Sequence, residues 1–194
     1  EEAAVFGEII VSAVPSKAVP TTARALGKCA DGKTLVNISK GIDEERLCRL
    51  SETFEHEMPS SMIAVLSGPS HAEEIAQDGM TYLTIGAHSQ SLAQQLANRF
   101  ACRFVKTRTS TDIRGIEYSA VLKNIYALTA GICKGAGYGD NFISVLISNA
   151  AQEMQRFLSV VAKNEMRDTN NFVYLGDLLV TAYSQHSRNR TFGQ

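Results

Sequence analysis

The feature that most constrains the fold is a change of pattern near residue 110. Before it, short apolar runs alternate with segments of helical periodicity, and after it no strand-like run follows. The run at 8–14 (EIIVSAV) lacks polar alternation, which is typical of a strand buried on both faces of a parallel sheet. Alternating β and α units indicate a doubly wound α/β layer. We therefore predict a Rossmann-like α/β part followed by an all-helical part.

The first part is expected to hold strands at 8–14, 34–39, 62–66 and 81–85, with a further strand beginning at 104. Its expected helices cover 17–26, 43–57, 72–77 and 89–100. Asp43 fits the N-cap of the second helix because Glu44 and Glu45 would then occupy its first turn. The second part is expected to form helices at 112–133, 141–163 and 171–183. We place the domains at residues 1–108 and 109–194.

One expected motif is missing from the first part. A dinucleotide-binding domain should open with a strand, a GxGxxG turn and a helix, because the glycines let the backbone approach a pyrophosphate. The nearest match, GAGYG at 135–139, follows a helix and is better explained as a helix-ending loop. We therefore interpret 1–108 as the C-terminal part of a dinucleotide-binding domain whose first βαβ unit is missing. Residues 109–194 would be the N-terminal part of a helical substrate domain.

Composition excludes several classes of partner and site. The net charge is -1 with no long run of one sign, which argues against a nucleic-acid or membrane surface as the main partner. No apolar run approaches the ~20 residues that cross a bilayer, so no membrane insertion is expected. The four cysteines form no CxxC pair, and no histidines cluster near them, so neither a disulfide framework nor a metal site is predicted. Buried free thiols indicate a reducing, cytoplasmic location.

Two strand ends carry polar or glycine residues, and ligands of open α/β sheets bind at the carboxyl ends of strands. Lys40, followed by Gly41, would point a cation into this crevice, although an ordinary surface lysine explains the segment equally well. Gly68 permits close backbone approach, and Ser70 could cap the next helix and present amide groups to an anion. A simple turn and cap is the stronger explanation for Gly68 and Ser70 taken alone.

Lys123 is the most informative single residue. Ala120 and Ala127 lie three residues before it and four after it on one helix face, so its side chain rises from a strip of small residues, with Asn124 beside it. Apolar neighbours such as Ile125 would leave little of this helix for water. An enclosed lysine is costly unless it is paired or its pKa is lowered, and a lowered pKa suits a general acid/base. The alternative is a lysine whose ammonium reaches solvent.

The last segment combines Asp177, Thr181, Ser187 and Arg188. Ser187 fits a helix N-cap, and Arg188 offers a planar fork suited to phosphate oxygens. Asp177 could fix the lysine or accept a hydrogen bond from a substrate hydroxyl. A solvated basic turn would explain the segment equally well.

Read in order, these segments resemble the bacterial-type NAD(P)-dependent glycerol-3-phosphate dehydrogenases over essentially the whole chain. The motifs that carry the resemblance are AVPS (13–16), SKG (39–41), LSGPSHAEE (66–74), VLKN (121–124), GYGDN (137–141), GDL (176–178) and SRNR (187–190).

The resemblance implies an enzyme that interconverts sn-glycerol 3-phosphate and dihydroxyacetone phosphate, often as a homodimer, with NAD or NADP as cofactor. The product would supply phospholipid synthesis. The resemblance also implies that Lys123 is the catalytic acid/base, and that Ala72 contacts the cofactor while Lys40 and Arg188 contact both cofactor and substrate. The other implied substrate-binding residues are Gly68, Ser70, Asn124, Asp177, Thr181, Ser187 and Asn189.

The chain also departs from the family pattern. Ile143 and Asn149 stand where the family usually has arginines, and FVYL at 172–175 replaces a smaller, glycine-rich stretch. These changes bear on substrate fit and dimer contacts. Two alternatives stay open. A related 3-hydroxyacid dehydrogenase also pairs a lysine and an asparagine on a helix after a Rossmann domain, and the missing dinucleotide loop and the changed residues are compatible with a non-catalytic module that binds a phosphorylated metabolite.

Overall fold

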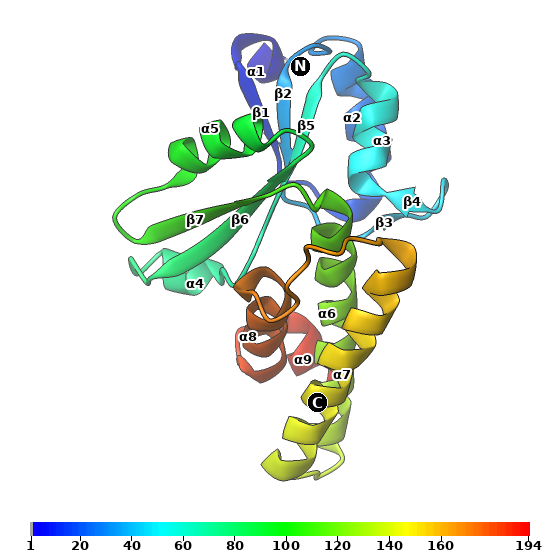
Figure 1. Cartoon of the computed structure of the whole chain (residues 1–194), viewed down its shortest axis with the longest axis vertical. Helices are drawn as coiled ribbons and strands as arrows, with labels where there is room; N and C mark the ends of the chain where they lie inside the picture. The colour runs from blue at the N-terminus through cyan, green and yellow to red at the C-terminus, as the bar shows by residue number, and fades with distance from the viewer. Residues whose placement is uncertain (1) are drawn as a thin grey trace.

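A computed structural model describes residues 2–194 and shows a sheet part joined to a helical part (Figure 1). The sheet order is β1-β2-β5-β6-β7. These strands are β1 (Ile9–Ser12), β2 (Thr34–Asn37), β5 (Met62–Ser67), β6 (Thr81–Ala87) and β7 (Val105–Ser110). The predicted Rossmann-like layer followed by helices is confirmed.

The sheet is mixed, whereas a parallel sheet was expected. β1, β2 and β5 run parallel, and so do β6 and β7, but β5 pairs antiparallel with β6. The connection between β5 and β6 contains only the short helix α4 (Ala72–Ile75). An antiparallel neighbour needs no long helical crossover, so this short connection suffices. The carboxyl ends of β1, β2 and β5 consequently share one edge of the sheet.

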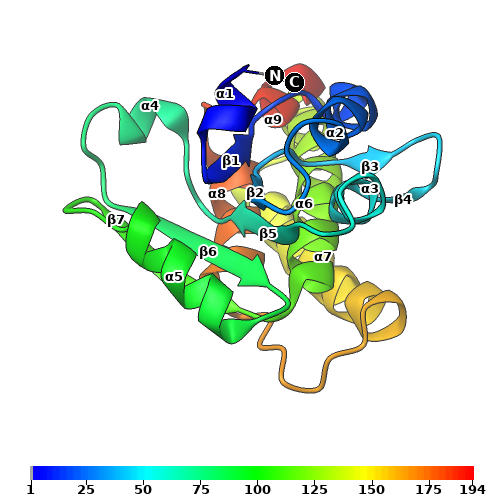
Figure 2. The ribbon, with the colours of Figure 1, turned by 90° about the horizontal axis from the view of Figure 1, so that it is seen from above.

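Helices cover both faces of the sheet (Figure 2). α2 (Val19–Gly27) and α3 (Leu50–Glu57) pack on one face and α5 (Gln90–Phe100) on the other. Adjacent strand residues belong to hydrophobic cores on opposite faces of the sheet. Leu35 and Ile63 pack with α2 and α3, while Val36 and Ala64 pack with α5. This explains why the strand runs are apolar without alternation. The short α1 (Glu2–Phe6) and a 3-10 turn at Ser16–Ala18 complete this part.

The helical part is built around the 23-residue helix α6 (Ile113–Gly135). It packs against α7 (Asp140–Val161), α8 (Asp177–Tyr183) and α9 (Arg188–Gly193). The GAGYG segment does end α6, with Gly137 at a φ of 87°. β7, the last strand, runs to Ser110, while the division into domains at 108 and 109 stays a prediction.

Two expected helices differ from prediction. The helix expected from Asp43 begins only at Leu50, because Ile42–Asp43 (β3) pairs antiparallel with Cys48–Arg49 (β4). The Asp43 carboxylate accepts the backbone N–H groups of Glu45 and Arg46, which closes the hairpin turn instead of capping a helix. The helix expected over 171–183 is one π-helical turn, η2 (Phe172–Gly176), followed by α8.

Within residues 2–194, no helix combines the length and the apolar character that a bilayer crossing requires.

Candidate active site

A cavity of about 560 Å³ lies between the sheet part and the helical part. Its sheet-side walls come from the segments that follow β1, β2 and β5, as expected for the carboxyl edge of an open α/β sheet. Its helical walls come from α6, α8 and the start of α9. The lining residues are Ala13, Val14, Pro15, Ser16, Ile38, Lys40, Gly68, Ser70, His71, Lys123, Asn124, Asp177, Val180, Thr181, His186, Ser187, Arg188 and Asn189.

Three charged residues of the cavity, Lys123, Asp177 and Lys40, contact one another. Lys123 Nζ donates to Asp177 Oδ1 at 2.5 Å, and Lys40 Nζ lies 3.8 Å from Asp177 Oδ2. Lys123 and Asp177 are 5% and 2% exposed, whereas Lys40 is half-buried. The expectation that Lys123 is enclosed is therefore confirmed. One carboxylate, Asp177, thus faces two amines in the cavity.

Burial is the largest influence on the Lys123 amine, because removal from water disfavours its charged form. The Asp177 carboxylate opposes this effect, and the neighbouring Lys40 ammonium reinforces it. Together they lower the pKa of Lys123 to about 7. Both protonation states are then accessible near neutrality, which is the property that a general acid/base needs.

Asp177 is placed by the turn that precedes it and by the sheet. It is the first residue of α8, directly after the π-helical turn, and Thr181 Oγ1 donates to its backbone carbonyl at 2.6 Å. Ser67 Oγ, at the end of β5, donates to Asp177 Oδ2 at 3.4 Å. Contacts from Lys40 and Ser67 therefore tie a helical-part carboxylate to two strand ends. No role had been predicted for Ser67.

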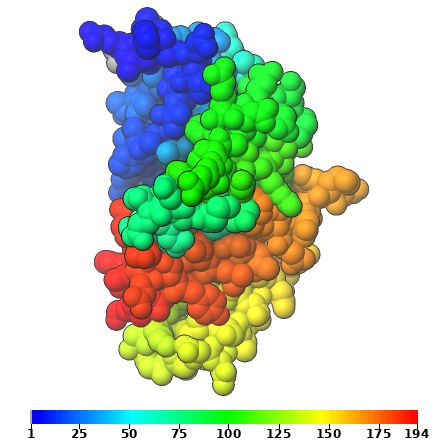
Figure 3. Space-filling model, turned by 90° about the vertical axis from the view of Figure 1, so that its left-hand side faces the viewer, coloured from blue at the N-terminus to red at the C-terminus, as the bar shows by residue number. Residues whose placement is uncertain are grey.

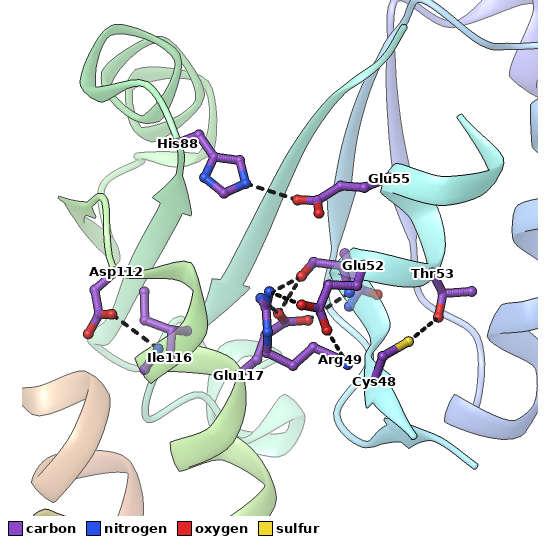
Figure 4. A network of polar contacts seen from close by, with 12 residues as sticks. Cys48, Arg49, Glu52, Thr53, Glu55, His88, Asp112, Ile116 and Glu117 are labelled. Carbon is purple, nitrogen blue, oxygen red and sulfur yellow. Dashed lines mark hydrogen bonds and ion pairs between the residues drawn. The ribbon is translucent and has the colours of Figure 1, made fainter. Parts of the chain in front are cut away.

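Helix α6 is anchored to the sheet part by the buried carboxylate of Glu117 (Figure 4). Glu117 accepts from Arg49 Nη1 at 2.8 Å, from the Ser51 backbone N–H at 2.9 Å and from Ser51 Oγ at 2.5 Å. Glu52 holds the other side of the Arg49 guanidinium at 2.8 Å. Burial raises the pKa of Glu117, which these donors partly offset. The network fixes the helix that carries Lys123 against the start of α3.

A second anchor links the start of α6 to the turn before Asp177. Asp112 caps α6 by accepting the Gly115 N–H, and it receives two hydrogen bonds from Arg167, at 2.6 and 2.9 Å. Tyr174 Oη donates to the same carboxylate at 2.6 Å. Tyr174 belongs to the segment that departs from the family pattern, so the departure adds a buried contact at this place. Ile143, another departure, is buried in the helical core, and neither it nor Asn149 lines the cavity.

The start of α9 contributes a separate polar group to the cavity. Ser187 Oγ accepts the Arg190 backbone N–H at 3.3 Å, which agrees with its predicted N-cap role. The following residues, Arg188 and Asn189, also line the cavity. His186 precedes them, and its ring centroid lies 5.9 Å from that of His71 across the cavity. Neither histidine has a role predicted from the sequence, although His71 directly follows Ser70 in the LSGPSHAEE motif.

The remaining predicted residues are placed as follows. Gly68, with φ of 138°, approaches β6 so closely that a Cβ atom would lie 2.4 Å from the Tyr82 carbonyl oxygen. Ser70 lines the cavity, but it does not cap α4 as expected; its hydroxyl donates to the Gly68 carbonyl at 2.9 Å, and His71 occupies the cap position. Asn124 lines the cavity and donates to the Ala120 carbonyl.

The exposure of Ala72 and of Ile125 bears on two of the expectations. Ala72 is exposed on α4 and does not line this cavity, so its predicted cofactor contact stays a prediction. Ile125, expected to help enclose Lys123, is 53% exposed and lies at a surface hollow between α6 and α7.

The residues at the carboxyl edge combine a close-packed backbone wall with positive charge. Gly41, at φ of 152°, brings the backbone after Lys40 so close to the β1 loop that a Cβ would lie 2.6 Å from Ser16 Cβ. The β1 and β2 loops thereby form one close-packed wall, with Lys40 beside it as a cation. Lys40 and Arg188 supply positive charge on two sides of the cavity, which suits an anionic cofactor and an anionic substrate.

Two family models match the chain. The model described as NAD-dependent glycerol-3-phosphate dehydrogenase N-terminus matches residues 1–93, and the one described as the C-terminus of the same enzyme matches residues 112–194.

Individual relatives agree with the family models. Proteins named glycerol-3-phosphate dehydrogenase (NAD(P)+) from Clostridium perfringens and Fusobacterium nucleatum are 37% and 39% identical to 100% and 96% of the chain. The chain covers 58% and 56% of these relatives, so it spans little more than half of their length. The crystal structure of glycerol-3-phosphate dehydrogenase from Coxiella burnetii is 30% identical and superposes with a TM-score of 0.87, over 95% of this chain and 56% of that one.

Proposed function

Because the chain belongs to the NAD-dependent glycerol-3-phosphate dehydrogenase family, we propose that the protein interconverts sn-glycerol 3-phosphate and dihydroxyacetone phosphate. The observation that carries this proposal is the buried Lys123 amine, whose pKa lies near neutrality, in a cavity with two further cations. NAD or NADP is the cofactor class that the family implies. The relatives' names and the cationic cavity support a phosphorylated alcohol as the substrate.

Lys123 performs the proton transfer in this proposal. In the oxidation direction its neutral amine accepts the C2 hydroxyl proton at Nζ, while the C2 hydrogen leaves with its electron pair. In the reduction direction the ammonium returns a proton to the carbonyl oxygen. A bound nicotinamide dinucleotide accepts or supplies the hydride. Asp177 holds the lysine 2.5 Å away and keeps its Nζ at one place in the cavity.

The other predicted residues hold the substrate and cofactor. Arg188 offers two parallel N–H donors to phosphate oxygens, and Ser187 and Asn189 stand beside it. Lys40 balances negative charge near Asp177 and contacts both molecules. Gly68, Ser70, Asn124 and Thr181 shape the substrate side, and Ala72 contacts the cofactor. A homodimer, a cytoplasmic location and a supply of glycerol 3-phosphate to phospholipid synthesis complete the proposal.

The test is steady-state turnover of the full-length protein with dihydroxyacetone phosphate and NADH or NADPH. Lys123→Met, which keeps the length and apolar character of the chain but removes the amine, should lower kcat by about 10²-fold or more. Lys134→Met, on the same helix but outside the cavity, is the matched control and should retain kcat. Near-normal turnover by Lys123→Met with its fold intact would remove Lys123 from the chemistry.

Substrate competition tests the alternatives. A preference for 3-hydroxy acids over glycerol 3-phosphate would favour a hydroxyacid dehydrogenase. Binding of dihydroxyacetone phosphate without any oxidation of NADH would favour a non-catalytic module.

A further inference from the structure

His71 and His186 face each other in the cavity from opposite parts of the chain. His71 follows β5 in the sheet part, and His186 lies between α8 and α9 in the helical part. Their rings are 5.9 Å apart and tilted by 57°. The space-filling view shows the α4 segment (teal) lying against the α8–α9 segment (orange to red), as this contact requires (Figure 3). The pair therefore spans the boundary between the two walls of the cavity.

The Nε2 atom of His71 is buried and has no hydrogen-bond partner among the described residues. A buried polar atom without a partner costs free energy, and most such atoms in folded proteins are paired with protein, water or ligand. The His71 ring also forms part of the cavity wall. The other two histidines differ, since His56 and His88 are largely exposed and lie beside the carboxylates of Glu57 and Glu55.

The chemistry around the pair favours an anionic acceptor. Asp177 is the carboxylate of the cavity, and it already faces Lys123 and Lys40. Among residues 2–194, no hydrogen bond joins Lys123, Lys40 or Asp177 to either histidine. The histidine pair therefore forms a second polar cluster in the cavity. His186 directly precedes Ser187 and Arg188 in the chain, and these residues line the same cavity as His71. An imidazole N–H and a guanidinium in one cavity offer a donor set for phosphate oxygens.

We propose that His71 donates a hydrogen bond from Nε2 to the phosphate of the bound substrate, and that His186 holds the His71 ring in the required orientation. The inference rests on the proposed function, because it assigns the phosphate end of the same substrate. It makes His71 a residue that selects phosphorylated over unphosphorylated alcohols. His186 is a positioning residue.

The decisive variant is His71→Phe in the full-length protein, since phenylalanine keeps the ring contact with His186 and removes the donor. We expect KM for glycerol 3-phosphate and the inhibition constant of inorganic phosphate to rise about tenfold, as for loss of one hydrogen bond to a charged group. KM for the cofactor should change less than twofold. His56→Phe makes the same substitution at an exposed site outside the cavity and should leave all three constants unchanged.

Three further variants test the geometry. His71→Gln carries an amide N–H close to the Nε2 position and should recover part of the lost phosphate affinity. His186→Phe keeps an aromatic neighbour and should change KM less than His186→Ala, which leaves the His71 ring unsupported. Equal effects of these two His186 variants would overturn the positioning role.

Different results would contradict the role of His71 and the proposed enzymatic function. Absence of turnover by the wild-type protein with glycerol 3-phosphate would count against the function. A turning-over wild type whose His71→Phe variant binds inorganic phosphate as tightly as before would overturn the inference alone. A His71→Phe variant that weakens only the cofactor would also overturn it, by placing His71 at the other molecule. Circular dichroism melting of each variant excludes loss of folding as the cause.

Discussion

Lys123 Nζ and Asp177 Oδ1 lie 2.5 Å apart although the residues are separated by 54 positions in the chain. The contact brings together the long helix α6 and the first residue of α8. Both groups are buried, so removal of Asp177 would leave the Lys123 amine without its hydrogen-bond partner. The pair thus connects the architecture of the helical part to the proton chemistry proposed for it.

The pH dependence of turnover should follow the protonation of Lys123. Because its pKa is lowered to about 7, alcohol oxidation, which needs the neutral amine, should rise about tenfold per pH unit below pH 7 and level off above it. Ketone reduction, which needs the ammonium, should fall as the pH rises above 7. Rates measured in both directions from pH 5 to 9 check this. A profile that is level between pH 6 and 8 in both directions would contradict it.

Asp177→Asn should move that profile. Asp177 opposes the lowering of the Lys123 pKa, so its neutral replacement should lower this pKa further and shift the midpoint for oxidation to lower pH. We also expect kcat to fall about 10- to 100-fold, because the amine loses its fixed partner. Asp140→Asn, an exposed carboxylate at the start of α7, is the control and should leave the midpoint in place. A midpoint that moves upward would show that Asp177 acts otherwise.

Arg188 should show its role through substrate binding. If its planar fork holds the phosphate, Arg188→Ala should raise KM for glycerol 3-phosphate by about 10²-fold, with a smaller change in kcat. Arg188→Lys keeps the charge but not the paired donors, so it should recover only part of the affinity. Steady-state kinetics at saturating cofactor measure both. An unchanged KM in Arg188→Ala would mean that the phosphate lies elsewhere in the cavity.

Much of this architecture follows from local sequence signals, and the exceptions have identifiable causes. Apolar runs located the strands because β1, β2 and β5 are covered on both faces. The antiparallel pairing of β5 with β6 was missed because the strand residues themselves encode burial but not direction. Asp43 was misassigned because an aspartate closes a hairpin turn with the same side-chain bonds that cap a helix.

The site could be predicted only where residue type implied chemistry. A lysine among alanines indicated an enclosed amine, and Lys123 is enclosed. The partners that enclose and anchor it come from distant segments, as with Glu117 and Arg49, 68 positions apart. His71 carried a weaker signal, because a histidine after a strand end is common. Its buried, unpartnered Nε2 is visible only in three dimensions.

The anchor around Asp112 should contribute measurably to stability. Tyr174→Phe removes one buried hydrogen bond to a carboxylate that keeps its Arg167 partner, so the free energy of unfolding at pH 7 should fall by about 1–2 kcal/mol. Urea denaturation of the full-length protein measures this. Tyr183→Phe, whose exposed hydroxyl makes only a 3.4 Å contact with Ser144, is the matched control and should change stability by less than about 0.5 kcal/mol.

The stabilising effect of Tyr174 on Asp112 should depend on pH. Burial alone would raise the pKa of Asp112, but hydrogen bonds from Arg167, Tyr174 and the Gly115 N–H, together with the Arg167 charge, hold it below its usual 3.8. The unfolded chain therefore takes up the proton first, so the stability that Asp112 contributes is fully present above about pH 4 to 5 and is lost as the pH falls through the lower folded-state pKa. Because Tyr174 helps to lower that pKa, the difference between wild type and Tyr174→Phe should shrink on acidification. A difference that grows between pH 5 and pH 3 would show that the hydroxyl stabilises the protein by another route.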